Sequence, residues 1–290
     1  MIKKIKTLYE AIKFEHTIFA LPFAYLGMVL AAHGIPTLWQ IAWITLAMAG
    51  ARSFAMALNR LVDASQDALN PRTAIRALPQ RLLKPFEMLL FVLVSLALFA
   101  FSAWELNPLC LSLVPVALIF LVAYSYTKRF TWLCHLVLGL ADGIAPIGGW
   151  LAVNPTLSAA NLLPPLLLGL AVTAWVGGFD LIYSCQDLDF DRSMGLHSIP
   201  ARFGVAVALR LSTVMHILTI ALLFSVGIIL HLDLLYWLGL VVATALLVYE
   251  HRLVNPSDLS KLNVAFFNMN GYIAVIVFLC TCLAIYVPWP

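Results

Sequence analysis

Residues 88–103 read MLLFVLVSLALFAFSA and contain no charged side chain. Apolar and polar positions do not alternate in this stretch, so it lacks the two-residue period of a membrane β-strand. A run of this kind indicates an α-helix in a lipid bilayer, where every backbone hydrogen bond is made within the helix. Similar runs follow one another through most of the 290 residues.

The composition of the whole chain gives the same result. Hydrophobic residues make up 63%, charged residues only 11%, and the mean hydropathy is +0.97. A soluble domain carries roughly 25% charged residues. We therefore predict an all-α polytopic membrane protein whose solvent is the lipid bilayer, with no nucleic-acid partner.

The apolar runs predict nine transmembrane helices around a central cavity that opens on the cytoplasmic side. They form one domain, residues 1–290, with the bundle over residues 17–287. The expected spans are 17–33, 38–58, 86–104, 108–126, 133–153, 161–184, 208–229, 232–250 and 265–287.

The distribution of positive charge predicts the orientation. With the N-terminus in the cytoplasm, all 17 lysines and arginines fall on the cytoplasmic side or at that end of a span. This bias is the usual signature of inner loops. We expect a bacterial-type inner membrane, a C-terminus outside, and a basic amphipathic helix over residues 2–14 lying on the inner leaflet.

Two acid-rich motifs stand where predicted helices reach the cytoplasm. Both repeat an acid every four residues, and both follow a helix that runs from outside to inside. The first places Asn59, Asp63 and Asp67 in N-x3-D-x3-D, and the second places Asp180, Tyr183, Asp187 and Asp191 in D-x2-Y-x3-D-x3-D.

Helical spacing predicts that each motif presents its oxygen atoms on one face. For the second motif we expect a single continuous stripe from Asp180 to Asp191. Hard cations such as Mg²⁺ take oxygen ligands and share them with substrate phosphates. The alternative, a solvated loop face, explains Asp189 but not Asp180, which lies within an apolar helix where a carboxylate is costly.

Basic residues near these motifs match a phosphate clamp, because arginine grips phosphate with two bonds and lysine adds a compact charge. Basic residues in inner loops are also expected simply because they orient a membrane protein. For each residue, therefore, both interpretations stay open: a phosphate clamp or a charge that only orients the chain. The candidates are Arg72, Arg76, Lys128, Arg129, Arg192 and Arg202.

Two further charges fall inside predicted spans. Arg52 lies seven residues before Asn59 on the same helical face, where a buried guanidinium needs an anionic partner. Asp142 lies among glycines in the fifth span, and it either polarises a substrate or hydrogen-bonds a neighbouring helix. We interpret His135 as a structural bystander, and His16 and His197 as either site-lining groups or bystanders.

These motifs resemble the UbiA superfamily of intramembrane aromatic prenyltransferases, whose two signatures are N-x3-D-x3-D and D-x2-Y-x3-D-x3-D. Further segments look familial: Asn70-Pro71-Arg72-Thr73 with Arg76, the stretch from Tyr124 to Arg129, and GLHSIPARFG at residues 195–204. The resemblance spans essentially the whole chain. It is greatest to the 4-hydroxybenzoate polyprenyltransferase branch and to relatives in menaquinone synthesis by the futalosine route.

The resemblance implies a mechanism for quinone biosynthesis. A polyprenyl diphosphate would be the donor, and an aromatic carboxylate the acceptor. Tyr183 and Asp180 would lie beside the nascent carbocation. Two Mg²⁺ ions would be held on the diphosphate by Asn59, Asp63, Asp67, Asp187 and Asp191, and its remaining charge neutralised by Arg72, Lys128 and Arg129.

Alternatives stay open at this level. The acceptor is 4-hydroxybenzoate or a dihydroxynaphthoate, and neither the prenyl chain length nor the oligomeric state follows from the sequence. A cation-coupled secondary transporter would also place acids in a membrane. However, it would need polar groups accessible from both sides, and here nearly all ionisable groups fall on the inner side. A purely structural protein leaves both motifs unexplained.

Overall fold

The computed structural model describes all residues except 1, 14–16, 33, 263 and 288–290. Its described part is helical and contains no β-strand. The helices are α1 (Ile2–Ala11), α2 (Thr17–Ala31), α3 (Leu38–Leu69), α4 (Pro85–Leu106), α5 (Pro108–Thr127), α6 (Cys134–Val153), α7 (Ala159–Ser184), η2 (Cys185–Asp187), α8 (Leu188–Ser193), α9 (Ile199–Phe203), α10 (Val205–Ile229), α11 (Leu234–Leu253), the π-helical η3 (Val264–Met269) and α12 (Asn270–Tyr286).

Seven helical segments of the described chain are long and apolar enough to cross a membrane: α3, α4, α5, α6, α7 with its continuation, α10 and α11. The predicted first and last spans correspond to the shorter apolar helices α2 and α12. Large apolar side chains such as Leu90, Val94 and Phe101 are exposed along α4. A surface of this kind is stable against lipid rather than water.

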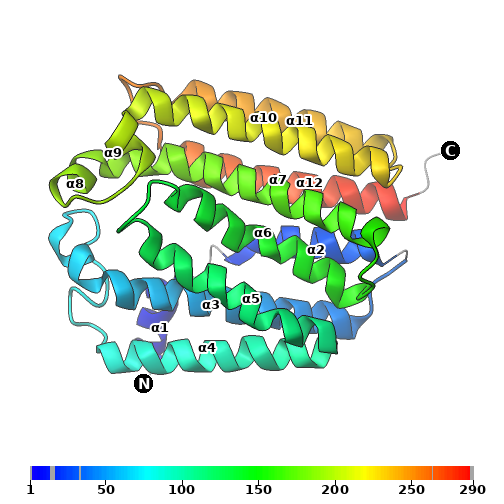
Figure 1. The fold of residues 1–290 in the computed structure, drawn as a ribbon, viewed down its shortest axis with the longest axis horizontal. Coiled ribbons are helices and arrows are strands. Elements are labelled where there is room, and N and C mark those ends of the chain that lie inside the picture. The colour runs from blue at the N-terminus through cyan, green and yellow to red at the C-terminus, as the bar shows by residue number, and fades with distance from the viewer. Residues whose placement is uncertain (1, 14–16, 33, 263, 288–290) are drawn as a thin grey trace.

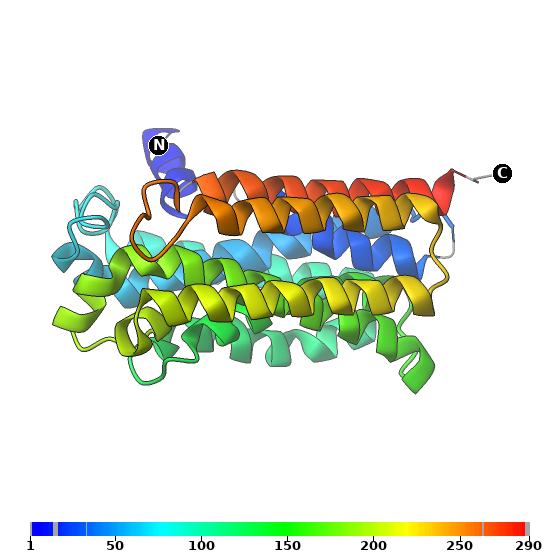
Figure 2. The ribbon, with the colours of Figure 1, turned by 90° about the horizontal axis from the view of Figure 1, so that it is seen from above.

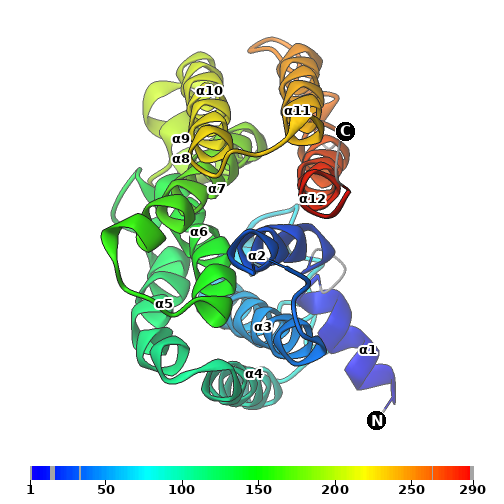
Figure 3. The same cartoon turned by 90° about the vertical axis from the view of Figure 1, so that its right-hand side faces the viewer.

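The long helices run side by side along the longest axis of the molecule (Figures 1 and 2). Seen from one end, they follow one another around the molecule from α3 and α4 to α11 and α12, and α2 lies inside that ring (Figure 3). Helix α6 is packed against both α2 and α7, which makes it central to the bundle.

Two glycines let α6 approach its neighbours closely. A Cβ atom at Gly149 would lie 2.0 Å from the carbonyl oxygen of Ala24 on α2. One at Gly139 would lie 2.3 Å from the carbonyl oxygen of Thr173 on α7. Small residues of this kind allow helix backbones to touch within membranes.

Helix α3 is longer than the predicted second span. It begins with a capping box between Thr37 and Gln40 and continues for 32 residues to Leu69. That length is about 48 Å, well beyond the hydrocarbon thickness of a bilayer. The helix therefore continues beyond the predicted end of the second span at residue 58, and Asn59, Asp63 and Asp67 lie on this extension.

The predicted stripe from Asp180 to Asp191 is also wrong, because the helix is interrupted. Helix α7 ends at Ser184, a 3₁₀ turn covers residues 185–187, and α8 begins at Leu188. A 3₁₀ turn advances 120° per residue instead of 100°, so three residues rotate the following acids by about 60°.

The predicted interfacial segment 2–14 contains α1, which ends at Ala11; residue 14 lies outside the described residues. Arg60 Nε on α3 donates to the carbonyl oxygen of Ala11 over 3.1 Å. Ile12 is buried against Phe54 and Ala57. The segment is thereby fixed to the end of α3.

Candidate active site

A cavity of about 990 Å³ runs through the bundle. Its wall along α3 extends from Ile44 to Asp67, a distance of about 35 Å along the helix. The polar lining is concentrated toward one end and includes Asp67, Arg72 and Asp180, whereas the rest is mostly apolar. The cavity therefore suits a long ligand with a polar head and an apolar tail.

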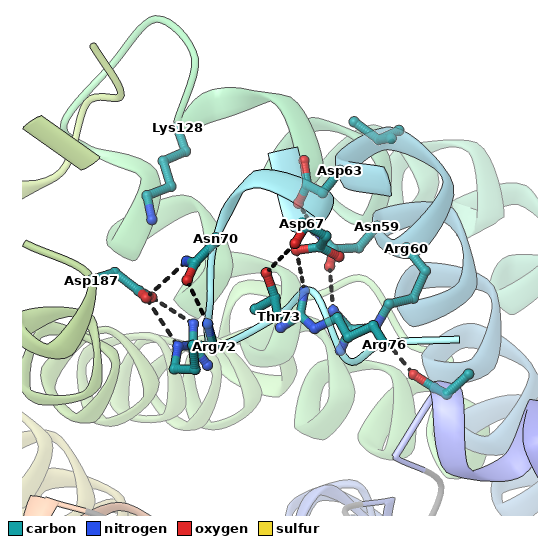
Figure 4. A network of polar contacts seen from close by, with 12 residues as sticks. Asn59, Arg60, Asp63, Asp67, Asn70, Arg72, Thr73, Arg76, Lys128 and Asp187 are labelled. Carbon is teal, nitrogen blue, oxygen red and sulfur yellow. Dashed lines mark hydrogen bonds and ion pairs between the residues drawn. The ribbon is translucent and has the colours of Figure 1, made fainter. Parts of the chain in front are cut away.

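The acids of the first cluster lie on α3, and their basic partners come from loop 70–84 and from the connection between α5 and α6. Asn59 Nδ2 donates to Asp63 Oδ2 over 2.8 Å, and Arg129 Nη2 lies 3.3 Å from Asp63 Oδ1. Arg76 Nη1 donates to Asp67 Oδ1 over 2.6 Å. Each acid of this cluster thus faces a basic side chain, and Figure 4 shows Arg76 directed to Asp67.

The second cluster draws its partners from other segments. Arg72 binds Asp187 with a fork, Nε to Oδ1 at 3.0 Å and Nη2 to Oδ2 at 2.6 Å. Asn70 Nδ2 adds a bond of 3.3 Å to the same carboxylate. Arg72 Nη1 also donates to the Tyr183 hydroxyl over 3.1 Å.

Asp191 completes the second cluster in full burial. Its Oδ1 lies 2.8 Å from Lys128 Nζ, and its Oδ2 accepts from the Ser198 hydroxyl over 2.8 Å. Burial alone would lower the pKa of Lys128, but the adjacent Asp191 carboxylate outweighs it and raises the pKa above the usual lysine value. The ammonium form of Lys128 is therefore kept.

Loop 70–84 joins the two clusters, because Arg72 binds the second while Arg76 binds the first. Figure 4 shows both arginines on this loop, one directed to Asp187 and the other to Asp67. Burial alone would lower the pKa of Arg72, but its bonds to Asp187 raise it. The loop thereby joins segments that are far apart in the sequence, and of the motif acids Asp67 and Asp180 line the cavity.

Other predicted residues occupy different places. Arg52 and Asp142 both line the cavity, with Nη1 and Oδ1 4.0 Å apart. Arg192 Nε donates to the Ala201 carbonyl oxygen, and Arg202 lies over the Phe203 ring. Neither Arg192 nor Arg202 forms an ion pair with a motif acid in the described structure.

The histidines differ from expectation. His197 is exposed, and His16 lies outside the described residues. His135, interpreted above as a bystander, has its Nδ1 2.6 Å from Asp180 Oδ2. This contact joins α6 to α7, and no local pattern in the sequence predicts it.

Other contacts to the acids were also missed. Asn70 and Ser198 bind motif acids, and Thr73 Oγ1 donates to the carbonyl oxygen of Asp67 over 3.0 Å. All three fall in the segments that look familial, NPRT and GLHSIPARFG, which was the signal available in the sequence.

The donor atoms fit divalent cations, although the acids are now paired with basic groups. Carboxylate and amide oxygens are the ligands that Mg²⁺ prefers. Asp67 is buried, and its Oδ2 has no hydrogen-bond partner among the described residues. Within that same part of the chain, no three acid, histidine or cysteine side chains are grouped closely enough to form a ready-made metal site.

These features define a class: a helical membrane protein that holds acids and cations from separate segments at one end of a deep apolar cavity. The sequence model of the UbiA prenyltransferase family matches residues 20–272. The chain belongs to the UbiA prenyltransferase family, and it is an integral membrane enzyme.

Individual relatives agree with this assignment. The 4-hydroxybenzoate octaprenyltransferase of Aeromonas hydrophila is 33% identical over 252 residues, 86% of this chain and 85% of that protein. The apo structure of a UbiA homolog from Aeropyrum pernix has a TM-score of 0.85 and 34% identity, covering 93% of this chain and 98% of that one. A UbiA homolog from Archaeoglobus fulgidus bound to GPP and Mg²⁺ shares the fold, with a TM-score of 0.66 and 18% identity over 93% of this chain and 99% of that one.

Proposed function

We propose that this protein transfers a polyprenyl group from a polyprenyl diphosphate to a ring carbon of 4-hydroxybenzoate, in a Mg²⁺-dependent step of quinone biosynthesis. The observation that carries the proposal is that loop 70–84 joins the two acid clusters, while its Arg72 and Arg76 line the polar end of the cavity beside Asp67. A diphosphate head and an apolar tail match this division. The names of the bacterial relatives supply the acceptor.

We further propose nine membrane crossings, with α2 and α12 added to the seven long helical segments. The acid clusters and the mouth of the cavity would face the cytoplasm, as would the N-terminus, because the 17 basic residues gather at that end. The C-terminus would lie outside. Residues 1–290 form one domain in this arrangement, with the N-terminal helix on the inner leaflet.

The acids would hold the cofactor, and we propose two ions, as the number of available carboxylates allows. The ligands would be Asn59, Asp63, Asp67, Asp187 and Asp191. When bound, Mg²⁺ supplies positive charge that stabilises the diphosphate as it leaves.

The basic residues would exchange partners when the donor binds. Arg72, Lys128 and Arg129 now neutralise Asp187, Asp191 and Asp63. With cations on those carboxylates, the same guanidinium and ammonium groups are free to donate to phosphate oxygens. Arg76 beside Asp67 would act likewise.

The chemistry then follows from the neighbouring side chains. The allylic C–O bond breaks, and the diphosphate leaves with the electron pair. Tyr183 lines the cavity here, and the face of its ring favours a nearby cation. The acceptor ring forms the new C–C bond and loses a proton, which Asp180 is placed to take. The apolar wall keeps water from the carbocation.

Arg52 and Asp142 would orient the acceptor. They line the cavity together without a close mutual bond, since Nη1 and Oδ1 are 4.0 Å apart. The guanidinium of Arg52 suits the carboxylate of a hydroxybenzoate, and Asp142 can accept a hydrogen bond from its hydroxyl group.

Purified protein with Mg²⁺ and a polyprenyl diphosphate should be given 4-hydroxybenzoate or 1,4-dihydroxy-2-naphthoate, and the products identified by mass spectrometry. We expect C-prenylated 4-hydroxybenzoate, loss of product in EDTA, and recovery with excess Mg²⁺. Undiminished activity in EDTA would contradict the proposed dependence on Mg²⁺. If only the naphthoate gave a prenylated product, the assignment of 4-hydroxybenzoate as the acceptor would be wrong.

A further inference from the structure

His135 makes a contact through each of its ring nitrogens. It lies in the first turn of α6 and is only 3% exposed. Nδ1 is 2.6 Å from Asp180 Oδ2, and Nε2 is 3.3 Å from the backbone nitrogen of Ile199. The histidine therefore stands between the cavity wall and the segment that follows α8.

The contact with Ile199 decides where the imidazole carries its hydrogen. A backbone N–H can only donate, so Nε2 must accept and carries no hydrogen. The hydrogen is then on Nδ1, and the neutral ring donates it to Asp180. A doubly protonated ring would set Nε2–H against the N–H of Ile199.

The backbone segment that donates to His135 is itself held in place by other hydrogen bonds. The N–H of His197 donates to the Lys128 carbonyl oxygen over 2.7 Å, and the Ser198 hydroxyl donates to Asp191 over 2.8 Å. The amide of Ile199 follows directly in the chain. Residues 197–199 thus connect the surroundings of Asp191 to those of Asp180.

We infer that His135 is a positioning residue for the prenyl-transfer reaction: as a neutral tautomer set by Ile199, it orients the Asp180 carboxylate toward the acceptor. Asp180 lines the cavity and His135 does not. The effect of His135 must therefore pass through Asp180. The inference rests on the proposed function, because it assigns Asp180 to the acceptor side.

The test compares three variants in the Mg²⁺-dependent assay with 4-hydroxybenzoate. His135→Leu removes both bonds, and kcat should fall about 10- to 100-fold, as for other residues that orient a functional group. The KM for the prenyl diphosphate should stay unchanged, since the donor binds at the acid clusters. His135→Gln should restore most of kcat, because its amide can accept from Ile199 and donate to Asp180.

His135→Asn has the same amide on a side chain one methylene shorter. It should not span both partners, and its kcat should remain low. The Gln and Asn pair keeps the test valid if the leucine variant fails to fold. His216→Leu is the matched control, because His216 is also a 3% exposed histidine and lies outside the cavity lining; it should lower thermal stability while retaining kcat.

Three results would overturn the inference: full kcat in folded His135→Leu, equal kcat in the Gln and Asn variants, or a rise in donor KM as the main effect. Failure of the proposed function looks different. In that case the wild-type protein forms no prenylated product with either acceptor.

Discussion

The two acid clusters have a similar composition but are built in different ways. In the first, Asp63 and Asp67 lie on one uninterrupted helix, and Arg76 is only nine residues from Asp67. In the second, the helix breaks at Ser184, and the fork on Asp187 comes from Arg72, 115 residues away in the chain. The pair of Asp67 with Arg76 depends on local geometry, whereas the pair of Asp63 with Arg129 and the bonds on Asp187 depend on the packed bundle.

Burial differs at only one acid of each cluster, because the side chains of Asp67 and Asp187 are nearly equally buried, at 8% and 11% exposed. The side chain of Asp63 is 25% exposed, whereas that of Asp191 is fully buried. A buried carboxylate needs its partners in place, because an unpaired charge in the interior is destabilising. The surroundings of Asp191 should therefore tolerate smaller displacements than those of Asp63.

The largest effect is expected from removing one charge in each cluster. Asp187→Asn and Asp67→Asn should each lower kcat about 10²- to 10³-fold, since both clusters stabilise the charge of the leaving diphosphate. Steady-state assays of the folded variants measure this. Asp189→Asn is the control, because this exposed acid lies between Asp187 and Asp191 and should be near wild type. An active Asp67→Asn variant would mean that only one cluster serves the reaction.

The dependence of the second cluster on packing can be tested at Gly139. Gly139→Ala would place Cβ 2.3 Å from the Thr173 carbonyl oxygen and push α6 from α7. Overpacking of this kind costs about 1–3 kcal/mol. Thermal unfolding in detergent should show the loss. Gly148→Ala is the control on the same helix, since its Cβ would meet no atom within 4 Å. Equal stability of the two variants would contradict the close packing.

A third prediction contrasts the two arginines of loop 70–84. Arg72 holds Asp187 with two bonds, whereas Arg76 makes one bond to Asp67. Lysine replaces a single contact but not a fork. Arg72→Lys should lower kcat/KM for the donor about tenfold, or about 1.4 kcal/mol, and Arg76→Lys should have a smaller effect. The reverse order would refute the structural difference between the clusters.

The smallest effect is expected at Ser198, whose hydroxyl donates to Asp191. Ser198→Ala removes this hydrogen bond to a buried charge, worth about 1–2 kcal/mol, and also the bond of 3.3 Å that the hydroxyl accepts from the N–H of Ala201; kcat should fall several-fold. Ser193→Ala is the matched control, because that hydroxyl is exposed and binds only the Phe190 carbonyl oxygen. Identical kinetics in both variants would show that Lys128 alone suffices to hold Asp191.

Features set by local geometry were predicted from the sequence, whereas contacts made by helix packing were not. The long runs of apolar residues predicted α4, α5, α6, α7, α10 and α11 to within a few residues, because a helix in lipid satisfies its own backbone. Helix α3 continues beyond its predicted end at residue 58. The first motif was placed correctly on one helical face. For the second, a continuous stripe was predicted, and the 3₁₀ turn at residues 185–187 contradicts it. The contact between His135 and Asp180 was not predicted at all.

By itself, the sequence determined the membrane-embedded helical class, the two acidic motifs and the family. Those properties depend on composition and on spacing of a few residues, which local geometry converts directly into structure. Only the tertiary structure decided that Arg72 reaches Asp187, that Lys128 reaches Asp191, and that His135 faces Asp180. Such contacts join residues 45 to 115 positions apart, and they exist only after helix packing has fixed which sides of α6, α7 and loop 70–84 meet.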